Sequence, residues 1–579
     1  MIFKKLYNLF FYNIFDFNEN ISIKSFIFLI TTFVFFTFFI VLRHAEIISN
    51  DGYDYAGKTS IERDAYKNLE DEKKNRRRVH IIDRNYKILA ETYEAPSLYA
   101  TPNKIISTDK NNLINELSII LNLDKEFIRK KIVSDKKFVW LKRTLTSTEH
   151  QKIINLGDVG LNFFKEETRN YPYGNLFSNL LGYTNIDNEG VIGIEKKLNS
   201  RIANQKQGSL MLSLDTDLQY IISSELSKIQ SKIDYNYATS IFIDIKNGEV
   251  LSLVSSPSFN INNLRKNKKT FKAANFINSF TERKITNEQI AKQITLSIAL
   301  EEGLINSQTL FDVSKPYKGI IDYNYFNGTY NYEECYINNS AICFSKIADL
   351  IGKDLFIDYY KKIGLIGKFN FQTKVNYNSV SSFDNVNQYE IAQGINIQAA
   401  PIQWIKAYSY LLNYYLIEPT LLINEQNTKL DNTIFSNYTR YSIKALLLRV
   451  LSNYEKLPEI FTNSPDLVVA SSSFITENNN TSNNLNSFMT YFPHDNPQYL
   501  IFMILQTPNK KVKNLNSFNS FDSNLDFLYA PLVTKEIIDK TKLSKKLNLR
   551  SSFGNYVEYQ DIKNDINIKL GSLFKKNKN

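Results

Sequence analysis

The chain has 579 residues, a net charge of +11 and a pI near 9.0. At ~150 residues per domain, this length predicts several domains with a sizeable core and excludes a small fold held together by disulfides. The hydrophobic share of 43% and the charged share of 22% are typical of folded proteins and exclude wholesale disorder. No basic run with interleaved aromatic residues accompanies the positive charge, so nucleic acid is not an expected partner.

Residues 25–42 are the first predicted element, an uncharged apolar stretch close to the ~20 residues that a membrane helix needs. A buried core helix is the alternative, but a surface that is apolar all round favours lipid. Lysines up to Lys24 precede the stretch and acidic residues follow Arg43, which predicts a cytoplasmic N-terminus over residues 1–24. Because no small-residue cleavage site follows, the sequence predicts an uncleaved transmembrane signal anchor.

The charged segment 43–75 is predicted to be a juxtamembrane linker. Within it, residues 52–59 match the phosphate-loop pattern G-x-x-x-x-G-K-[ST]. A phosphate loop needs a strand before it and a helix N-terminus that meets the phosphate, whereas here the preceding element is the predicted membrane helix. We therefore interpret the match as a turn.

Between residues 76 and 230, short strands alternate with helices, which predicts an α+β module. Residues 79–85 and 96–102 are predicted to be strands. Apolar residues at helical spacing predict helices over residues 112–122 and 216–233.

A second module begins with a predicted hairpin over residues 238–254, whose turn is Asn247-Gly248. Asn-Gly is a strong hairpin signal because both residues tolerate positive φ. A second hairpin is predicted over residues 488–505. Between the hairpins, apolar spacing predicts helices over residues 289–302, 342–350, 401–414 and 438–451.

These elements predict a sheet flanked by helices over residues 231–540, followed by a Lys/Asn-rich tail over residues 541–579. Two cysteines, Cys335 and Cys343, and four scattered histidines have no metal-ligand spacing, so neither a metal nor a cofactor is expected. A disulfide between the cysteines is an option in an oxidising compartment, but two separate thiols is the interpretation we favour.

Several short segments, in their order and spacing, resemble the class B penicillin-binding proteins, and most closely the division-specific peptidoglycan transpeptidases. In the first module the segments are Arg78-Val-His-Ile-Ile-Asp83-Arg84-Asn85, Phe138-Val-Trp-Leu-Lys-Arg143, Tyr171-Pro172, Leu181-Gly182-Tyr183-Thr184 and Gly193-Ile194-Glu195. In the second they are Leu212-Ser-Leu-Asp215, Gly248-Glu-Val-Leu251 and Ser255-Ser-Pro257-Ser-Phe259-Asn260. The resemblance implies an α+β chain with a single N-terminal membrane helix, a pedestal or dimerisation domain over residues 76–230, and a transpeptidase domain with a serine β-lactamase-like sheet over residues 231–540.

Three motifs carry acyl transfer in that family. In S-x-x-K, the serine attacks the peptide stem and the lysine, one helical turn on, takes the serine proton. S-x-N supplies hydroxyl and amide groups. K-T-G supplies a cation for the substrate carboxylate and a glycine where a strand must approach the substrate closely.

The first motif is altered at the position that its flanks mark. Residues 298–303 look like the end of the S-x-x-K helix, and counting back places Gln289 at the serine and Lys292 at the lysine. A glutamine amide cannot be deprotonated near neutral pH and cannot form the acyl-ester, so Gln289 removes the nucleophile. Lys292 keeps the general-base position, although an isolated lysine on a helix is more often solvated. Glu288 stands where a glycine is expected.

The other two motifs are altered as well. The second reads Asn339-Ser340-Ala341, in which only the middle serine matches. The third reads Ser471-Ser472-Ser473-Phe474-Ile475 where G-K-T-G-T would stand, so the cation and both glycines are missing. Other matches to S-x-x-K begin at Ser107, Ser134 and Ser572, but none has the helical context of the motif.

We therefore expect a catalytically silent relative of the division transpeptidase, anchored in the inner membrane, with most of the chain in the periplasm. The resemblance implies that it acts in septal peptidoglycan synthesis through divisome proteins, foremost a multi-span peptidoglycan glycosyltransferase, and that peptidoglycan peptide stems are further candidate partners. Two alternatives stay open. One is an active D,D-transpeptidase whose serine nucleophile is misplaced here, and the other is a protein that binds peptidoglycan or a β-lactam without a covalent bond.

Overall fold

The computed structural model describes residues 30–41, 78–204, 208–264, 276–322, 326–413, 417–423, 433–453, 468–479, 481–493, 496–508 and 529–543. Two compact units divide the chain, Met1–Arg76 and Arg77–Asn579. The described part of the first unit is a helix over residues 30–41, all of whose side chains are exposed. Among the described residues, none of the helices has both the length and the apolar composition needed to cross a bilayer.

Several predictions fall wholly or partly outside the described residues. They concern the ends of the predicted anchor (residues 25–29 and 42), the linker with its phosphate-loop match, and the tail beyond residue 543.

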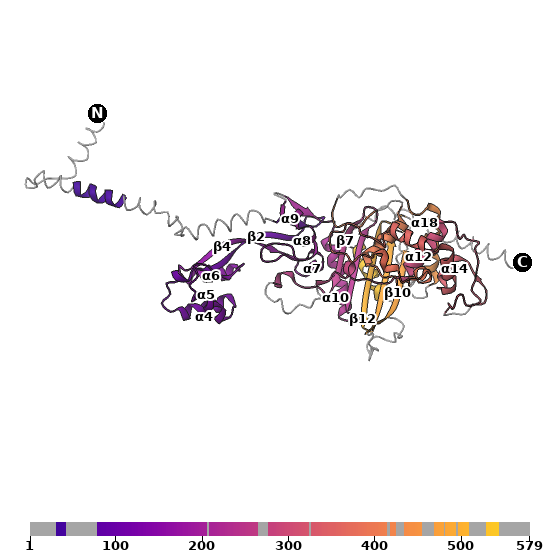
Figure 1. Cartoon of the computed structure of the whole chain (residues 1–579). Helices are drawn as coiled ribbons and strands as arrows, with labels where there is room; N and C mark the ends of the chain where they lie inside the picture. The colour runs from indigo at the N-terminus through magenta and orange to yellow at the C-terminus, as the bar shows by residue number, and fades with distance from the viewer. Residues whose placement is uncertain are drawn as a thin grey trace, which may run out of the picture. The chain divides into compact units, whose positions relative to one another are not determined.

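A five-stranded sheet organises the N-terminal part of the second unit (Figure 1). Its strands are β1 (His80–Ile82), β2 (Ile88–Ala100), β3 (Val139–Lys142), β4 (Leu161–Asn170) and β5 (Ser209–Met211). The order is β3-β2-β1-β5, and β4 also pairs with β2. The strand predicted over residues 96–102 is the second half of β2, and it ends where Pro102 begins the short helix η1 (Pro102–Lys104). Proline fits there because the first residues of a helix need no backbone donor.

Six helices accompany this sheet: α4 (Lys110–Leu121), α5 (Lys125–Ile132), α6 (Ser147–Ile154), α7 (Ser178–Leu181), α8 (Gly193–Lys197) and α9 (Asn199–Asn204). The first three have side-chain N-caps, Asp109, Asp124 and Thr146, that accept hydrogen bonds from free N–H groups of the first turn. Their buried leucines and isoleucines pack on Leu98 and Val139 of β2 and β3 in one apolar cluster.

A buried ion cluster holds the first sheet to α8. Arg78 and Arg169 share the carboxylate of Glu195, and all three side chains are almost completely buried. Arg78 also donates to the Asn188 carbonyl oxygen at 2.9 Å, and Arg169 donates to the Val79 carbonyl oxygen at 2.7 Å. The cluster keeps one positive charge in excess in a dry interior, and the carbonyl oxygens of Asn188 and Val79 accept further hydrogen bonds from the two guanidinium groups.

A second five-stranded sheet, wholly antiparallel, forms the centre of the C-terminal part. Its order is β10-β11-β12-β6-β7. The last strand in the sequence, β12, therefore pairs with the first strand of this sheet, β6. The strands are β6 (Tyr237–Asp244), β7 (Glu249–Ser256), β10 (Val468–Asn479), β11 (Thr481–Phe492) and β12 (Tyr499–Pro508). Both predicted hairpins are present, as β6–β7 and β11–β12.

Helices cover both faces of this sheet (Figure 1). Successive residues of β12 point to opposite faces of the sheet, as in any strand, and so enter two different cores. Phe502 lies in one core and Met503 in the other. The core around Met503 includes α10 (Thr216–Gln230) and α20 (Tyr529–Leu543). The larger core includes α11 (Ser279–Glu282), α12 (Glu288–Glu301), α13 (Tyr332–Ile337), α14 (Ala341–Ile351), α15 (Lys353–Lys362), α16 (Gln388–Gln393), α17 (Pro401–Leu412) and α18 (Asn437–Asn453).

The smaller elements of this part are the strand pair β8 (Phe311–Asp312) and β9 (Thr329–Tyr330) and the short helices η2 (Ile261–Asn263) and η5 (Val380–Phe383).

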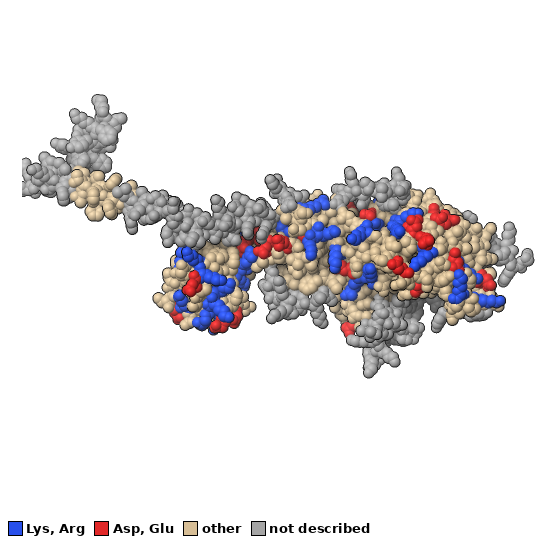
Figure 2. All heavy atoms as spheres, viewed as in Figure 1, with Lys and Arg blue, Asp and Glu red and all other residues tan. Residues whose placement is uncertain are grey.

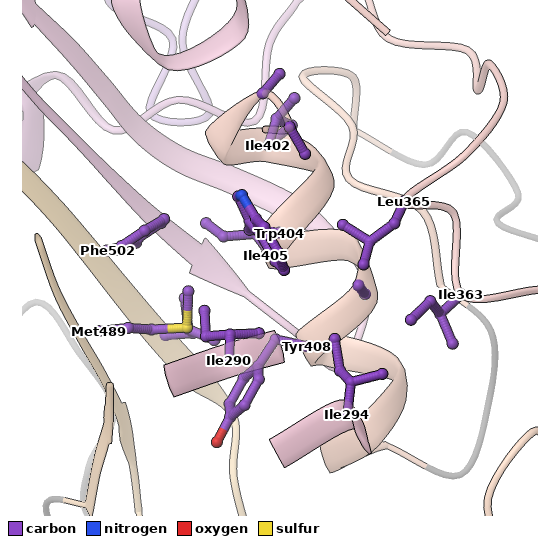
Figure 3. Packing of buried hydrophobic residues seen from close by; sticks show 14 of the residues in the cluster. Ile290, Ile294, Ile363, Leu365, Ile402, Trp404, Ile405, Tyr408, Met489 and Phe502 are labelled. Carbon is purple, nitrogen blue, oxygen red and sulfur yellow. The ribbon is translucent and has the colours of Figure 1, made fainter. Parts of the chain in front are cut away.

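Helix α17 lies at the centre of the larger core. Figure 3 shows Trp404 and Tyr408 of this helix near Phe502 and Met489 of the sheet, with Ile290 of α12 close by. Trp404 is fully buried, and its Nε1 donates to the Ile285 carbonyl oxygen at 3.1 Å, just before α12 begins. The sheet and α17 therefore form a rigid support for the start of α12.

On the face drawn in Figure 2, charges of both signs are spread over the sheet and its helices. On the face shown in Figure 2, basic and acidic side chains alternate across the described part of this region. This distribution is typical of an ordinary solvated surface.

Candidate active site

Helix α12 carries the first predicted motif near its N-terminus. The Asn287 side chain caps the helix by accepting a hydrogen bond from the Ile290 N–H at 3.1 Å. Gln289, the second helical residue, is half-buried, whereas every side chain from Ile290 to Leu300 is buried. The residue at the predicted nucleophile position therefore lies at the edge of the core, and its amide has no ionisable proton to give up.

Lys292 lies one turn further on and is 3% exposed. Its Nζ donates a hydrogen bond of 2.6 Å to Asn339 Oδ1, and it lies 3.8 Å from the Glu288 carboxylate. The ammonium also lies 5.7 Å from the centroid of the Phe344 ring. Burial lowers the pKa of Lys292, and the negative charge of Glu288 opposes that shift. Lys292 is thus desolvated, as a general base would be. Its hydrogen-bond acceptor, however, is the amide oxygen of Asn339 and not a hydroxyl group.

The second predicted motif lies directly against the first. Asn339 has a φ of +53°, a left-handed conformation that asparagine tolerates better than most residues. Ser340 is buried and caps α14, where its Oγ accepts a hydrogen bond from the Cys343 N–H at 3.1 Å. The same hydroxyl donates to Asp322 Oδ2 at 2.6 Å, and Ala341 is the first residue of the helix. The one serine that matches S-x-N is therefore engaged in holding the loop together.

Cys335 and Cys343 flank this loop and form a disulfide, which corrects our expectation of two separate thiols. Their Cα atoms are 5.7 Å apart, within the normal range for a disulfide, and both residues are fully buried. The prediction was wrong because spacing alone does not show that the turn between α13 and α14 brings the two side chains together.

The third predicted motif lies on β10, an edge strand of the second sheet. Ser472 is opposite Phe488 of β11, Ser473 is opposite Ser487, and Phe474 is opposite Asn486. Helix α12 contacts this strand. The fold thus brings the three predicted segments together. Helix α12 contacts β10, and its Lys292 contacts the loop that carries Asn339.

Two of the other S-x-x-K matches, at Ser107 and Ser134, lie among the described residues. Ser107 Oγ donates to Asp158 Oδ2, and Ser134 Oγ donates to the Lys131 carbonyl oxygen, so neither of these S-x-x-K matches forms a Ser–Lys pair. Ser572 lies outside the described residues. Ser297, two turns beyond Gln289, donates to the Gln293 carbonyl oxygen within its own helix.

Gly394, the residue after α16, packs closely against the first turn of α12. A Cβ at this position would lie 2.6 Å from the Ala291 Cβ and 2.8 Å from the Glu288 Cα, and the φ of +76° also favours glycine. The first turn of α12 therefore has close backbone neighbours that fix its position.

Two family models match the chain. Residues 238–521 match the penicillin binding protein transpeptidase domain, and residues 73–211 match the penicillin-binding protein dimerisation domain. The chain belongs to the class B penicillin-binding proteins.

Curated relatives of this class B penicillin-binding protein carry related names. A peptidoglycan D,D-transpeptidase FtsI from Buchnera aphidicola is 27% identical over 370 residues, which cover 57% of this chain and 63% of the relative. FtsI of Escherichia coli is 22% identical over 377 residues, 58% of this chain and 63% of the relative. A probable peptidoglycan D,D-transpeptidase PenA from Neisseria meningitidis is 22% identical over 407 residues, 64% of this chain and 69% of the relative. The comparisons with the two FtsI proteins thus span less than two thirds of those relatives.

A solved structure has the same fold. The crystal structure of a peptidoglycan synthetase from Bifidobacterium adolescentis aligns with a TM-score of 0.61 over 82% of this chain and 96% of that one, at 17% identity. This likeness confirms the mixed α/β penicillin-binding fold predicted for the chain.

Sequence reasoning missed three parts of the site. Asp322, which holds Ser340 and also accepts the Ile342 N–H at 2.9 Å, lies in a segment without recognisable pattern. The Glu288–Lys292 contact had a signal, because residues four apart on a helix face each other. The disulfide had only the spacing of two cysteines as its signal.

Proposed function

We propose that this class B penicillin-binding protein is a catalytically silent homologue of the peptidoglycan D,D-transpeptidases and acts through partner contacts. The observation that carries the proposal is Gln289, a non-nucleophilic amide at the serine position, with Lys292 bound to an asparagine instead of a serine. An acyl-enzyme needs an activated oxygen or sulfur nucleophile, whereas Gln289 carries an amide and Ser297, two turns on, donates within its own helix.

The proposed setting is septal peptidoglycan synthesis in cell division. Residues 25–42 would anchor the chain in the inner membrane, with residues 1–24 in the cytoplasm and the remainder in the periplasm. The Cys335–Cys343 disulfide supports an oxidising compartment for the transpeptidase domain. The match to the dimerisation domain over residues 73–211 supports a retained pedestal, the surface through which we propose contacts with divisome proteins and a multi-span peptidoglycan glycosyltransferase.

Incubation with a labelled β-lactam tests catalytic silence. The full chain in detergent is incubated with the label, and its intact mass is measured beside that of an active class B penicillin-binding protein. We expect an adduct on the active protein and an unchanged mass for this chain. A covalent adduct would contradict silence and favour the misplaced-nucleophile alternative, whereas reversible binding without an adduct would favour a non-covalent binding protein.

A pull-down from membranes tests the partner contacts. The full chain should recover a peptidoglycan glycosyltransferase or a divisome protein, and a version that lacks residues 76–211, which keeps α10 on the second sheet, should recover much less. Equal recovery by both versions, or recovery of neither class of protein, would argue against a role through the pedestal.

A further inference from the structure

A polar pocket of about 820 Å³ lies beside the N-terminal end of α12. It is bordered by α11, by residues 283–288 and 374–376, and by residues 395–398 after α16, with Tyr237 and Gln506 at the ends of two strands. Of the site described above, only Glu288 lines it. The volume lies within the ~300–1,000 Å³ common for small-molecule sites.

Two cations in this pocket have no acidic partner among the described residues. Glu282 pairs with Lys374 at 2.9 Å, and Glu288 lies 3.8 Å from Lys292, so both carboxylates of the lining already face a lysine. Arg283 and Lys284 also line the pocket and are only half-exposed. A concave site with uncompensated positive charge raises the local concentration of anions.

The guanidinium of Arg283 is held in a fixed orientation. Its Nε donates to Ser279 Oγ at 3.2 Å, and its Cζ lies 4.3 Å from the centroid of the Tyr237 ring. Ser279 and Tyr237 are both buried, so these contacts rest on the core. Nη1 and Nη2 make no hydrogen bond to any described residue. An oriented guanidinium with both terminal nitrogens available fits the two oxygens of a carboxylate.

We propose that this pocket binds a small molecule or peptide terminus that carries a carboxylate, with Arg283 as the bidentate anchor and Lys284 as the second cation. Thr286 and Gln398 add neutral polar groups to the lining. The proposed site uses none of the three altered motifs. Its test is therefore independent of catalytic silence and of the proposed divisome role.

Calorimetric titration of the full chain in detergent tests the proposal. The probe is N-acetyl-alanyl-alanine with a free carboxylate, and its matched control is the same dipeptide with a C-terminal amide. We expect the acid to bind at least about tenfold more tightly, the effect of losing a charged hydrogen-bonded pair. Equal binding of acid and amide, or binding of neither, would overturn the proposal. If inorganic phosphate competes as well as the dipeptide, the pocket selects tetrahedral anions and not carboxylates, which would also overturn the proposal.

Variants locate the site. Arg283→Gln should weaken binding of the acid about tenfold or more, and Arg283→Lys, which keeps the charge without the planar fork, should fall between this variant and the parent. Lys284→Gln should have a smaller effect. Lys362→Gln, which removes an exposed lysine paired with Asp358 on α15, should bind like the parent. If Arg283→Lys and Lys284→Gln bind the acid as the parent does, the pocket is not the binding site.

Discussion

Lys292 Nζ donates a 2.6 Å hydrogen bond to Asn339 Oδ1, so the first two predicted motif segments are in direct contact. In the active family a hydroxyl is expected at the position of Asn339. An amide oxygen accepts a hydrogen bond from an ammonium group but cannot pass a proton on. The contact therefore packs α12 against the loop, and under the proposed placement of the motifs it offers Lys292 no proton to exchange.

Two substitutions at Asn339 should separate this hydrogen bond from the backbone conformation. Asn339→Gly loses the side chain but suits the φ of +53°, whereas Asn339→Ala loses the side chain and is strained there. We expect Asn339→Gly to lower the free energy of unfolding by about 1 kcal/mol and Asn339→Ala by about 1 kcal/mol more. Urea unfolding measures both. Equal losses would show that the left-handed backbone contributes nothing at this position.

The burial of Lys292 predicts a pH dependence of stability. Its pKa is lower in the folded chain than the ordinary value of 10.5, so the unfolded chain binds more protons between the two values. The free energy of unfolding should therefore rise as pH increases from the folded pKa to the unfolded pKa of Lys292. Below this interval the lysine is charged in both states, and the folded chain bears the full cost of burying that charge.

Lys292→Met should remove that contribution. Unfolding free energies measured from about pH 7 to about pH 11 should rise less steeply for the variant than for the parent. Lys362→Met, at an exposed position, is the matched control and should keep the slope of the parent. Parallel curves for Lys292→Met and the parent would contradict a depressed lysine pKa.

Restoring the nucleophile alone should not restore acylation. Gln289→Ser places a hydroxyl near Lys292, but Asn339 still occupies the lysine and β10 still lacks the cation of K-T-G. We expect no covalent β-lactam adduct by intact mass for Gln289→Ser or for its control, Gln289→Ala. An adduct on the serine variant would show that the second and third motifs are wrongly placed here.

The shared carboxylate of Glu195 should be far more important to stability than a surface ion pair. Glu195→Gln leaves two buried guanidinium groups short of one negative charge, which should lower the free energy of unfolding by about 3–5 kcal/mol. Glu126→Gln, which disrupts the exposed pair with Arg129 on α5, should lower it by about 1 kcal/mol or less. Hydrogen exchange of β2 and β4 measures both, and similar losses in protection would contradict the distinction.

The disulfide should stabilise the turn between α13 and α14. It closes a short loop, a sequence separation of 8, for which chain entropy predicts a stabilisation of about 2.5 kcal/mol. Reductant should lower the melting temperature of the parent but leave that of a Cys335→Ser/Cys343→Ser variant unchanged. Two free thiols titrated in the denatured, unreduced parent would show that the bond does not form.

Local patterns predicted the elements of the fold well because they report local physics. Apolar spacing placed a helix at residues 289–302, and α12 spans Glu288–Glu301. The Asn247-Gly248 turn placed the β6–β7 hairpin. The pairing of β12 with β6 could not be read in this way, because it joins residues more than 250 apart and depends on which apolar faces remain free after collapse.

The candidate site was predictable only as far as its motifs extend along the chain. Gln289, Lys292 and Asn339 were placed from flanking sequence, and the structure brings Lys292 and Asn339 into contact. The roles of Asp322 and Arg283 depend on contacts between distant segments. Asp322 contacts Ser340, and Arg283 contacts Tyr237. No spacing rule in a single sequence reports such meetings.

Tolerance to substitution differs between the buried part of α12 and its first turn. The eleven residues from Ile290 to Leu300 are all enclosed by the sheet, α17 and neighbouring helices, so most substitutions there would create a cavity or a clash. Glu288 and Gln289, in the first turn of the same helix, are only half-buried, so their side chains have more room to vary. Substitutions at these two positions can therefore change the chemistry at the start of α12 while the rest of the helix keeps its place in the core.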